Sequence, residues 1–134
     1  MSVHRRRSIV TGLATVVTVA AGAGITAGAA GASRSVPARM LVYAQEWSLW
    51  PSRTSLPAGQ VIVQLWNRGQ DAHDLRIRRL DHHGRMVGRT WGMTLTQSGK
   101  LSEASWRLGA GRYELYCSMP GHVKLGMHAR LRVR

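Results

Sequence analysis

The stretch that decides the fold of this chain runs Tyr116-Cys117-Ser118-Met119-Pro120-Gly121-His122-Val123-Lys124-Leu125-Gly126-Met127. It brings the chain's only cysteine, an imidazole and a thioether into one loop, with four residues between Cys117 and His122 and four between His122 and Met127. The Pro120-Gly121 pair favours a turn that folds the three donors toward one point. Cysteine or methionine alone is more often a core residue, but the combined run after an apolar strand favours a site for one soft metal ion.

A trigonal copper site of this kind needs a second histidine. His73 follows the Gly-containing turn at Asn67-Arg68-Gly69 and precedes an alternating segment, so we expect it at the start of a strand, where it could project toward Cys117. The other histidines fit other roles: His82 and His83 lie in a turn marked by Asp81 and Gly84, His128 follows Met127 directly, and His4 belongs to a leader. His73 is therefore the candidate for the second imidazole ligand.

Two segments of the sequence resemble the cupredoxins. The segment 109–122, followed by Gly126-Met127, resembles their copper loop, and its Cys, His and Met spacing is most similar to the rusticyanin, auracyanin and sulfocyanin group. The segment 56–75 resembles the strand, turn and first-histidine segment of the family. The resemblance covers the chain from about Leu41 to its end. It implies an all-β, single cupredoxin-like Greek-key β-sandwich with one type-1 (blue) copper ion, held by His73, Cys117 and His122 as equatorial ligands and Met127 as the axial ligand.

One residue next to the predicted site departs from the family pattern. Where the family commonly has Asn after the first histidine, this chain has Asp74. The resemblance implies that this side chain bonds Ser118 and ties the two ligand segments together. An aspartate could accept a hydrogen bond from the Ser118 hydroxyl, but its charge would favour Cu(II) and lower the reduction potential. Trp47 or Trp50, otherwise expected as packing residues, is a candidate for excluding water near the metal, which would raise the potential.

The first 32 residues have the composition of an export signal. A positive segment, Arg5-Arg6-Arg7, precedes the uncharged stretch 9–29, and Ala30-Gly31-Ala32 predicts cleavage before Ser33. Arg6-Arg7-Ser8-Ile9-Val10 resembles a twin-arginine signal, with ordinary secretion as the alternative. Without cleavage, the uncharged stretch is long enough to form an N-terminal membrane anchor. Both outcomes predict an exported protein, in the periplasm or outside the cell.

The rest of the chain has room for one small domain. We expect a short flexible lead-in over 33–39 and the copper-binding domain over 40–134. The lone cysteine excludes an internal disulfide, and it also excludes the binuclear copper centre of oxidase subunits. Alternation and turn signals predict seven strands. These are 40–45, 60–66, 73–80, 85–91, 101–108, 112–117 and 129–134.

The charge of the chain is strongly basic. Removal of the three leader arginines lowers the formal net charge from +13 to +10. Such a charge can steer encounter with an acidic redox partner, and it can favour association with anionic lipid or cell-wall polymer. The predicted export and the lack of a recognition motif argue against a nucleic-acid partner. We expect the protein to be a monomer.

The resemblance to the cupredoxins implies a protein that shuttles single electrons by cycling copper between Cu(I) and Cu(II). It also implies that electrons leave through His122, where the apolar residues Met119, Pro120, Val123 and Leu125 would form the docking site for redox partners. The sequence offers no Ser-His-Asp set, paired carboxylates or phosphate loop, so we do not expect an enzyme. The alternative is a copper-delivery or copper-buffering protein of the cell envelope. A structural zinc site is disfavoured by Met127, because zinc prefers nitrogen, oxygen and thiolate donors.

Overall fold

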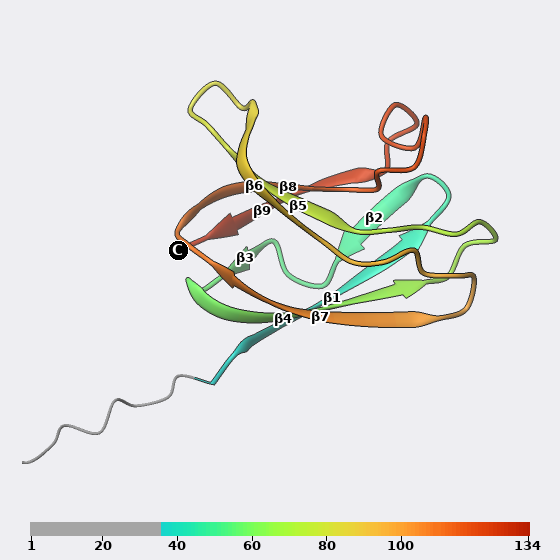
Figure 1. The fold of residues 1–134 in the computed structure, drawn as a ribbon, viewed down its shortest axis with the longest axis horizontal. Helices are drawn as coiled ribbons and strands as arrows, with labels where there is room; N and C mark the ends of the chain where they lie inside the picture. The colour runs from blue at the N-terminus through green and yellow to red at the C-terminus, as the bar shows by residue number, and fades with distance from the viewer. Residues whose placement is uncertain (1–35) are drawn as a thin grey trace, which may run out of the picture. The chain divides into compact units, whose positions relative to one another are not determined.

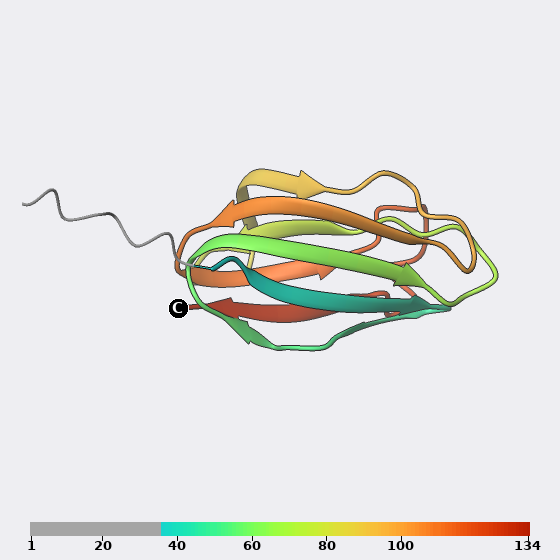
Figure 2. The same cartoon turned by 90° about the horizontal axis from the view of Figure 1, so that it is seen from below.

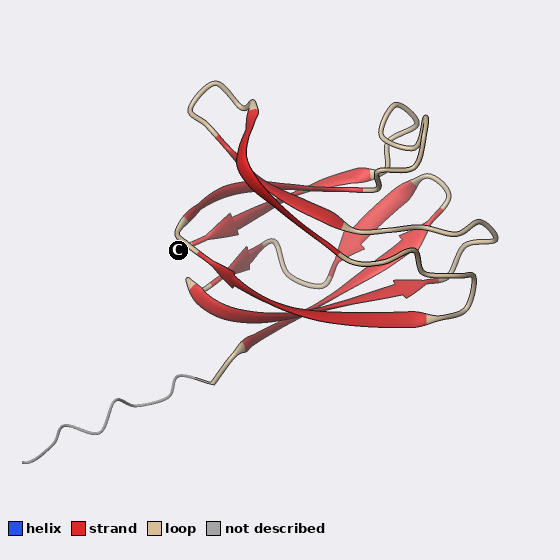
Figure 3. Cartoon of the chain, in the orientation of Figure 1, coloured by secondary structure: helices blue, strands red, loops and turns tan. Residues whose placement is uncertain are grey.

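The computed structural model describes residues 36–134, which form nine β-strands and no helix (Figures 1 and 3). Four strands form one sheet in the order β2-β1-β4-β7, and five form the other in the order β3-β9-β8-β5-β6. The strands are β1 (Ala38–Gln45), β2 (Ser48–Pro51), β3 (Ser55–Leu56), β4 (Gly59–Asn67), β5 (Arg76–Leu80), β6 (Met86–Gly92), β7 (Leu101–Leu108), β8 (Gly111–Tyr116) and β9 (His128–Val133). The expected all-β sandwich is therefore confirmed.

The four-stranded sheet follows the alternation of its central strand. In β4, Val61, Val63 and Leu65 are fully buried, and the residues between them are only half-buried. This strand pairs in parallel with β1, where Val42 lies opposite Leu65, and antiparallel with β7. Figure 2 shows β1, β4 and β7 side by side in one layer.

The five-stranded sheet supplies the other half of the core. Ile77 of β5, Leu115 of β8 and Leu131 of β9 point inward and pack in the same buried cluster as the side chains of β1 and β4. Each such side chain, once buried, stabilises the fold by about 1.5–3 kcal/mol. Because one face of each strand is committed to this core, the register of the strands is fixed.

The structure differs from the expected strands in three places. β1 begins at Ala38, so the last two residues of the expected lead-in are already paired. The short strands β2 and β3 were not predicted, because their pairing partners, β1 and β9, are brought to them by the fold. His73 does not begin a strand: it forms an isolated bridge with Thr96, and β5 begins three residues later.

The topology brings the candidate ligands to one end of the sandwich. β8 leads directly into Cys117, and β9 begins directly after Met127, so the segment between them is a loop at that end (Figure 1). The connection between β4 and β5 carries His73. In the described part of the chain, no helix has the length and hydropathy to cross a membrane. The predicted leader and cleavage position lie outside the described residues.

Candidate metal centre

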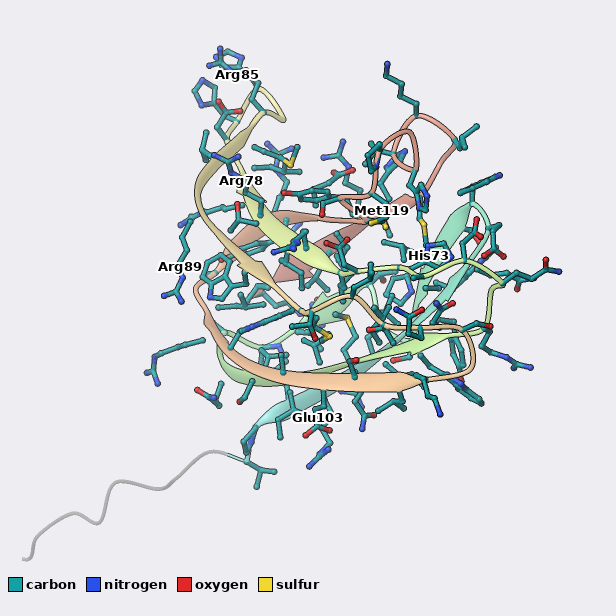
Figure 4. The ribbon with its side chains drawn as sticks, turned by 45° about the vertical axis from the view of Figure 1, so that its right-hand side comes forward. His73, Arg78, Arg85, Arg89, Glu103 and Met119 are labelled. Atoms are coloured by element: carbon teal, nitrogen blue, oxygen red, sulfur yellow. The ribbon has the colours of Figure 1, made fainter. Side chains whose placement is uncertain are left out.

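Three of the predicted ligands converge on one point. His73, Cys117 and His122 each offer one donor atom, and these atoms all lie within 4.8 Å of one another. The Cys117 Sγ is 3.5 Å from the His122 Nδ1, and the two imidazole rings are 5.2 Å apart between centroids. Metal–nitrogen and metal–sulfur bonds are about 2.0–2.3 Å long, so the donor atoms are spaced closely enough to share one ion. In Figure 4, His73 and Met119 lie toward one end of the domain, and Arg85 and Arg89 lie toward the other.

Main-chain hydrogen bonds shape the loop that carries two of these donors. The N–H of His122 donates to the carbonyl of Met119 over 3.1 Å, which closes the turn at Pro120-Gly121. Gly121 has a φ of +83°, a left-handed conformation that favours glycine. The N–H of Met127 donates to the carbonyl of His122 over 3.0 Å, and the N–H of Cys117 donates to the carbonyl of Met127 over 3.2 Å. Met127, the predicted axial ligand, is thereby held beside Cys117, and its side chain is fully buried.

The thiol of Cys117 is fully buried, and burial raises its pKa above the ordinary value. A metal ligand must be a thiolate. Metal binding at this site therefore has to displace a proton from Cys117, so the affinity should rise with pH until the free thiol itself ionises.

His73 presents one nitrogen to a carboxylate and leaves the other without a protein partner. Its Nε2 lies 3.1 Å from the Oε1 of Glu46, whereas its Nδ1 is buried and has no hydrogen-bond partner. Buried nitrogens in this situation are rare in proteins. A carboxylate on the far nitrogen is the usual arrangement around a metal-bound histidine, because it fixes the tautomer and leaves the near nitrogen as the donor. The orphaned Nδ1 is thus an observation that fits a metal ion at this place.

Glu46 itself is held by a second bond. Its Oε1 accepts the backbone N–H of Asp71 over 2.8 Å, and this hydrogen bond lowers the pKa of Glu46 below its ordinary value despite some desolvation. Glycine at position 69 leaves room for it, because a Cβ on Gly69 would collide with the Glu46 carboxylate and displace it. The sequence analysis missed Glu46. Nothing in the sequence connects it to His73, which lies 27 residues further on.

The residue after Glu46 covers the other histidine. The ring of Trp47 meets the ring of His122 edge-on, with centroids 4.7 Å apart and planes at 75°. Trp47 is thus the tryptophan near the candidate site, whereas Trp50 is 65% exposed and donates its Nε1–H to Ser48. The two-residue turn Glu46-Trp47 between β1 and β2 therefore contacts both imidazoles.

The predicted link between the two ligand segments is present. Asp74 accepts the backbone N–H of Ser118 over 2.6 Å and the Ser118 hydroxyl over 2.5 Å. It also accepts the Nε–H of Arg76 over 2.8 Å. Burial raises the pKa of Asp74, but these three hydrogen bonds outweigh burial and hold the pKa below its ordinary value. An ionised carboxylate is therefore fixed between His73 and the cysteine loop.

The other histidines of the described chain lie away from this cluster, as expected. His82 and His83 are exposed in the turn between β5 and β6, with their rings 3.8 Å apart. His128 begins β9, and its Nδ1 lies 2.9 Å from the carboxylate of Glu114 on the neighbouring strand β8. His4 lies outside the described residues.

Comparison with known proteins supports the fold. No protein-family model matches the sequence, and no curated protein matches it. Among solved structures, reduced auracyanin from Roseiflexus castenholzii has a TM-score of 0.59 at 14% identity, covering 74% of this chain and 98% of that one. Auracyanin A from Chloroflexus aurantiacus, described as a "blue" copper protein, has a TM-score of 0.59 at 17% identity, covering 74% and 100%.

Rusticyanin from Thiobacillus ferrooxidans gives a similar result, with a TM-score of 0.58 at 19% identity, covering 72% of this chain and 76% of that one. The chain therefore has the cupredoxin fold. Within that fold, the solved structures that it resembles include auracyanins and rusticyanin, as the loop spacing had indicated.

Proposed function

We propose that this protein is a type-1 copper protein that carries single electrons, with His73, Cys117 and His122 as equatorial ligands and Met127 as the axial ligand. The observation that carries the proposal is the buried cluster of three donor atoms within 4.8 Å, one of them a nitrogen left without a protein partner. A thiolate, two imidazoles and a weak thioether form the donor set of blue copper sites. A copper ion held there supplies one-electron chemistry by cycling between Cu(I) and Cu(II).

The residues around the donors keep the site rigid. The carboxylate of Glu46 fixes the orientation of His73, and the bonds that Ser118 donates to Asp74 fix the start of the cysteine loop. The imidazoles therefore need little rearrangement when the charge of the site changes. Burial of Cys117 and His73 also excludes water. Both features favour rapid electron exchange over ligand exchange.

His122 is the part of the site nearest to solvent, with 9% of its surface exposed. Beyond it, Val123 and Leu125 are 43% and 56% exposed, which makes an apolar surface beside the ligand. Such a small surface suits weak and transient docking. We propose that redox partners dock here and that electrons pass through the His122 ring. The basic charge of the chain favours partners with an acidic surface.

Burial of the donors also favours electron transfer over the alternative function, copper delivery. A delivery protein has to release its ion to a partner, whereas two of the three clustered donors here have no exposed surface. Electron transfer is therefore the preferred function, and the protein is proposed to be a carrier and not an enzyme. Its location in the periplasm or outside the cell is proposed from the leader over residues 1–32.

The visible absorption spectrum tests the proposal. Residues 33–134 would be loaded with Cu(II), and an intense thiolate-to-copper band is expected. The band should be absent in Cys117→Ser and unchanged in the matched control His82→Ala, which removes an exposed imidazole outside the cluster. A pale spectrum typical of imidazole or amide ligands in the unmodified chain would exclude the type-1 site.

A further inference from the structure

The fold gathers cations that are spread along the sequence onto one face of the five-stranded sheet. Because side chains alternate along a strand, Arg112 of β8 and Arg130 and Arg132 of β9 all point away from the core. Arg78 of β5 joins them through its pairing with Glu114. Glu114 is the acidic member of this group, so the outer face of these three strands has an excess of positive charge.

Two of these arginines occupy directly opposite positions in the sheet. Arg112 and Arg132 are register partners in the antiparallel pair β8–β9. Side chains in such a pair start about 4.5–5.5 Å apart, and like charges placed directly opposite destabilise a sheet. An anion in contact with both guanidinium groups would reduce this repulsion.

No acidic side chain of the described residues is paired with either arginine. Glu114 is occupied by Arg130 and by His128, each at 2.9 Å. The Nη2 of Arg112 donates over 2.7 Å to the neutral backbone carbonyl of Asp81, which fixes the position of the guanidinium group. The Asp81 carboxylate is bonded to Arg85 instead, over 3.1 Å. Among the ion pairs within residues 36–134, none includes Arg112 or Arg132.

A cavity of about 550 Å³ adjoins this arginine pair. Its walls include both arginines, the two histidines of the β5–β6 turn, and the apolar Leu80, which is the register partner of Arg112. Figure 1 shows that turn, in yellow, rising from the sheet at the end opposite to the loop between β8 and β9. The cavity thus combines a cationic side with an apolar side, and its volume is within the usual range for small-molecule sites.

We propose that this cavity binds a phosphate-bearing ligand, with the phosphate group between Arg112 and Arg132. Guanidinium groups bind phosphate oxygens through paired hydrogen bonds, which makes arginine the preferred residue for such recognition. The cavity is larger than a phosphate ion requires, so the remaining space beside Leu80 accommodates the organic part. The phosphate belongs either to a soluble phosphate ester or to the headgroup of an anionic phospholipid.

This site is independent of the copper assignment. Arg112 lies near the start of β8 and Cys117 directly follows its end, and five residues of a strand span roughly 17 Å. Binding of a phosphate group at the arginine pair should therefore leave the copper ligands in place. Success or failure of the phosphate test gives no information on the copper spectrum, and the reverse also holds.

Calorimetric titration of residues 33–134 with glycerol 1-phosphate tests the proposal. Saturable binding with one site is expected. Arg132→Ala should weaken binding roughly 10-fold or more, because a charged hydrogen-bond partner is lost. Arg132→Lys keeps the charge and loses the planar fork, so it should also weaken binding. The control is Arg107→Ala, which removes an exposed arginine of β7 in the other sheet and should change the affinity less than twofold.

Vesicle sedimentation distinguishes the two sources of phosphate. Binding to phosphatidylglycerol vesicles that is lost in Arg132→Ala but kept in Arg107→Ala would identify a lipid headgroup. Binding of glycerol 1-phosphate alone would identify a soluble ester. Two results would overturn the proposal. One is an equal effect of Arg132→Ala and Arg107→Ala on the binding of both probes. The other is that the unmodified chain, shown by circular dichroism to be folded, binds neither probe.

Discussion

The two imidazoles of the candidate site have different surroundings. His73 has no exposed surface, and a carboxylate from another part of the chain holds its far nitrogen at 3.1 Å. His122 is 9% exposed, sits in a turn next to the exposed Val123, and is covered on one side by the edge of Trp47. The difference indicates a division of roles: His73 is the fixed inner ligand, and His122 is the ligand that faces partners.

The largest effect is expected when each imidazole is removed in turn. His73→Gly and His122→Gly should both abolish the blue band of the copper-loaded domain. Added imidazole should restore the band only in His122→Gly, because the space left there opens to solvent, whereas the space left by His73 is enclosed. Titration of each variant with imidazole, followed by visible absorption, checks this. Equal recovery in both variants would remove the distinction between the two ligands.

The next effect concerns the carboxylate of Glu46, which contacts His73. Glu46→Gln keeps the shape but removes the charge behind His73, and loss of such a partner typically weakens metal binding about 10–100-fold. Gly69→Ala keeps the charge, but its Cβ would push the Glu46 carboxylate away. Both variants should lower the copper affinity, measured by competition with a chelator.

The matched control is Glu103→Gln, which removes an exposed carboxylate of β7. If Glu46→Gln binds copper as tightly as this control, Glu46 does not orient the ligand.

A smaller effect is expected at Asp74, which lies beside the inner ligand. Asp74→Asn removes a negative charge near the site and should raise the reduction potential by roughly 30–60 mV. The upper value corresponds to about a tenfold change in the equilibrium constant for one-electron reduction. Cyclic voltammetry measures this shift. A potential that stays the same or falls would contradict the electrostatic role of Asp74.

Asp74 should also contribute to acid sensitivity. Its folded pKa lies below the ordinary value of 3.8, so its contribution to stability is complete above that value and is lost as the pH falls through the folded pKa. The metal-free Asp74→Asn variant should therefore lose less stability than the unmodified chain between pH 5 and pH 3. Urea unfolding at the two pH values checks this, and parallel losses in both proteins would argue against a depressed pKa.

The smallest effect on the protein itself is expected on the side of His122 that faces solvent. Leu125→Asp changes a side chain that is 56% exposed, so the absorption spectrum should not change and the free energy of unfolding should change by no more than about 0.5 kcal/mol. The rate of electron exchange with a redox partner should fall, as measured by stopped-flow absorption. Leu101→Asp, at a 52% exposed position on β7, is the control and should leave that rate unchanged.

The sequence was sufficient for those parts of the site that depend on local spacing. The loop from Cys117 to Met127 needs only a turn at Pro120-Gly121 to bring its donors together, and the alternation in β4 identifies a buried face. Asp74 and Ser118 could be paired from the resemblance, and the structure confirms their hydrogen bonds.

The parts that sequence reasoning missed depend on contacts between distant segments. The interaction of Glu46 with His73 arises because the β1–β2 turn folds over the β4–β5 connection, which no local pattern encodes. β3 is two residues long and exists only through its pairing with β9. The strand expected to begin at His73 begins later, because His73 and Thr96 exchange both backbone hydrogen bonds in an isolated bridge.

The hydrogen bond from Cys117 to the carbonyl of Met127 has a consequence for engineering. It joins the two ends of the loop at its base. Apart from the bonds that Ser118 donates to Asp74, the loop is held by hydrogen bonds between its own residues, as from Leu125 to Gly121. Most of the loop conformation therefore depends on the loop residues themselves, with Asp74 as its anchor on the sandwich. A shorter or longer loop with the same two ends could be transplanted here to retune the metal site, while the nine strands keep their pairing.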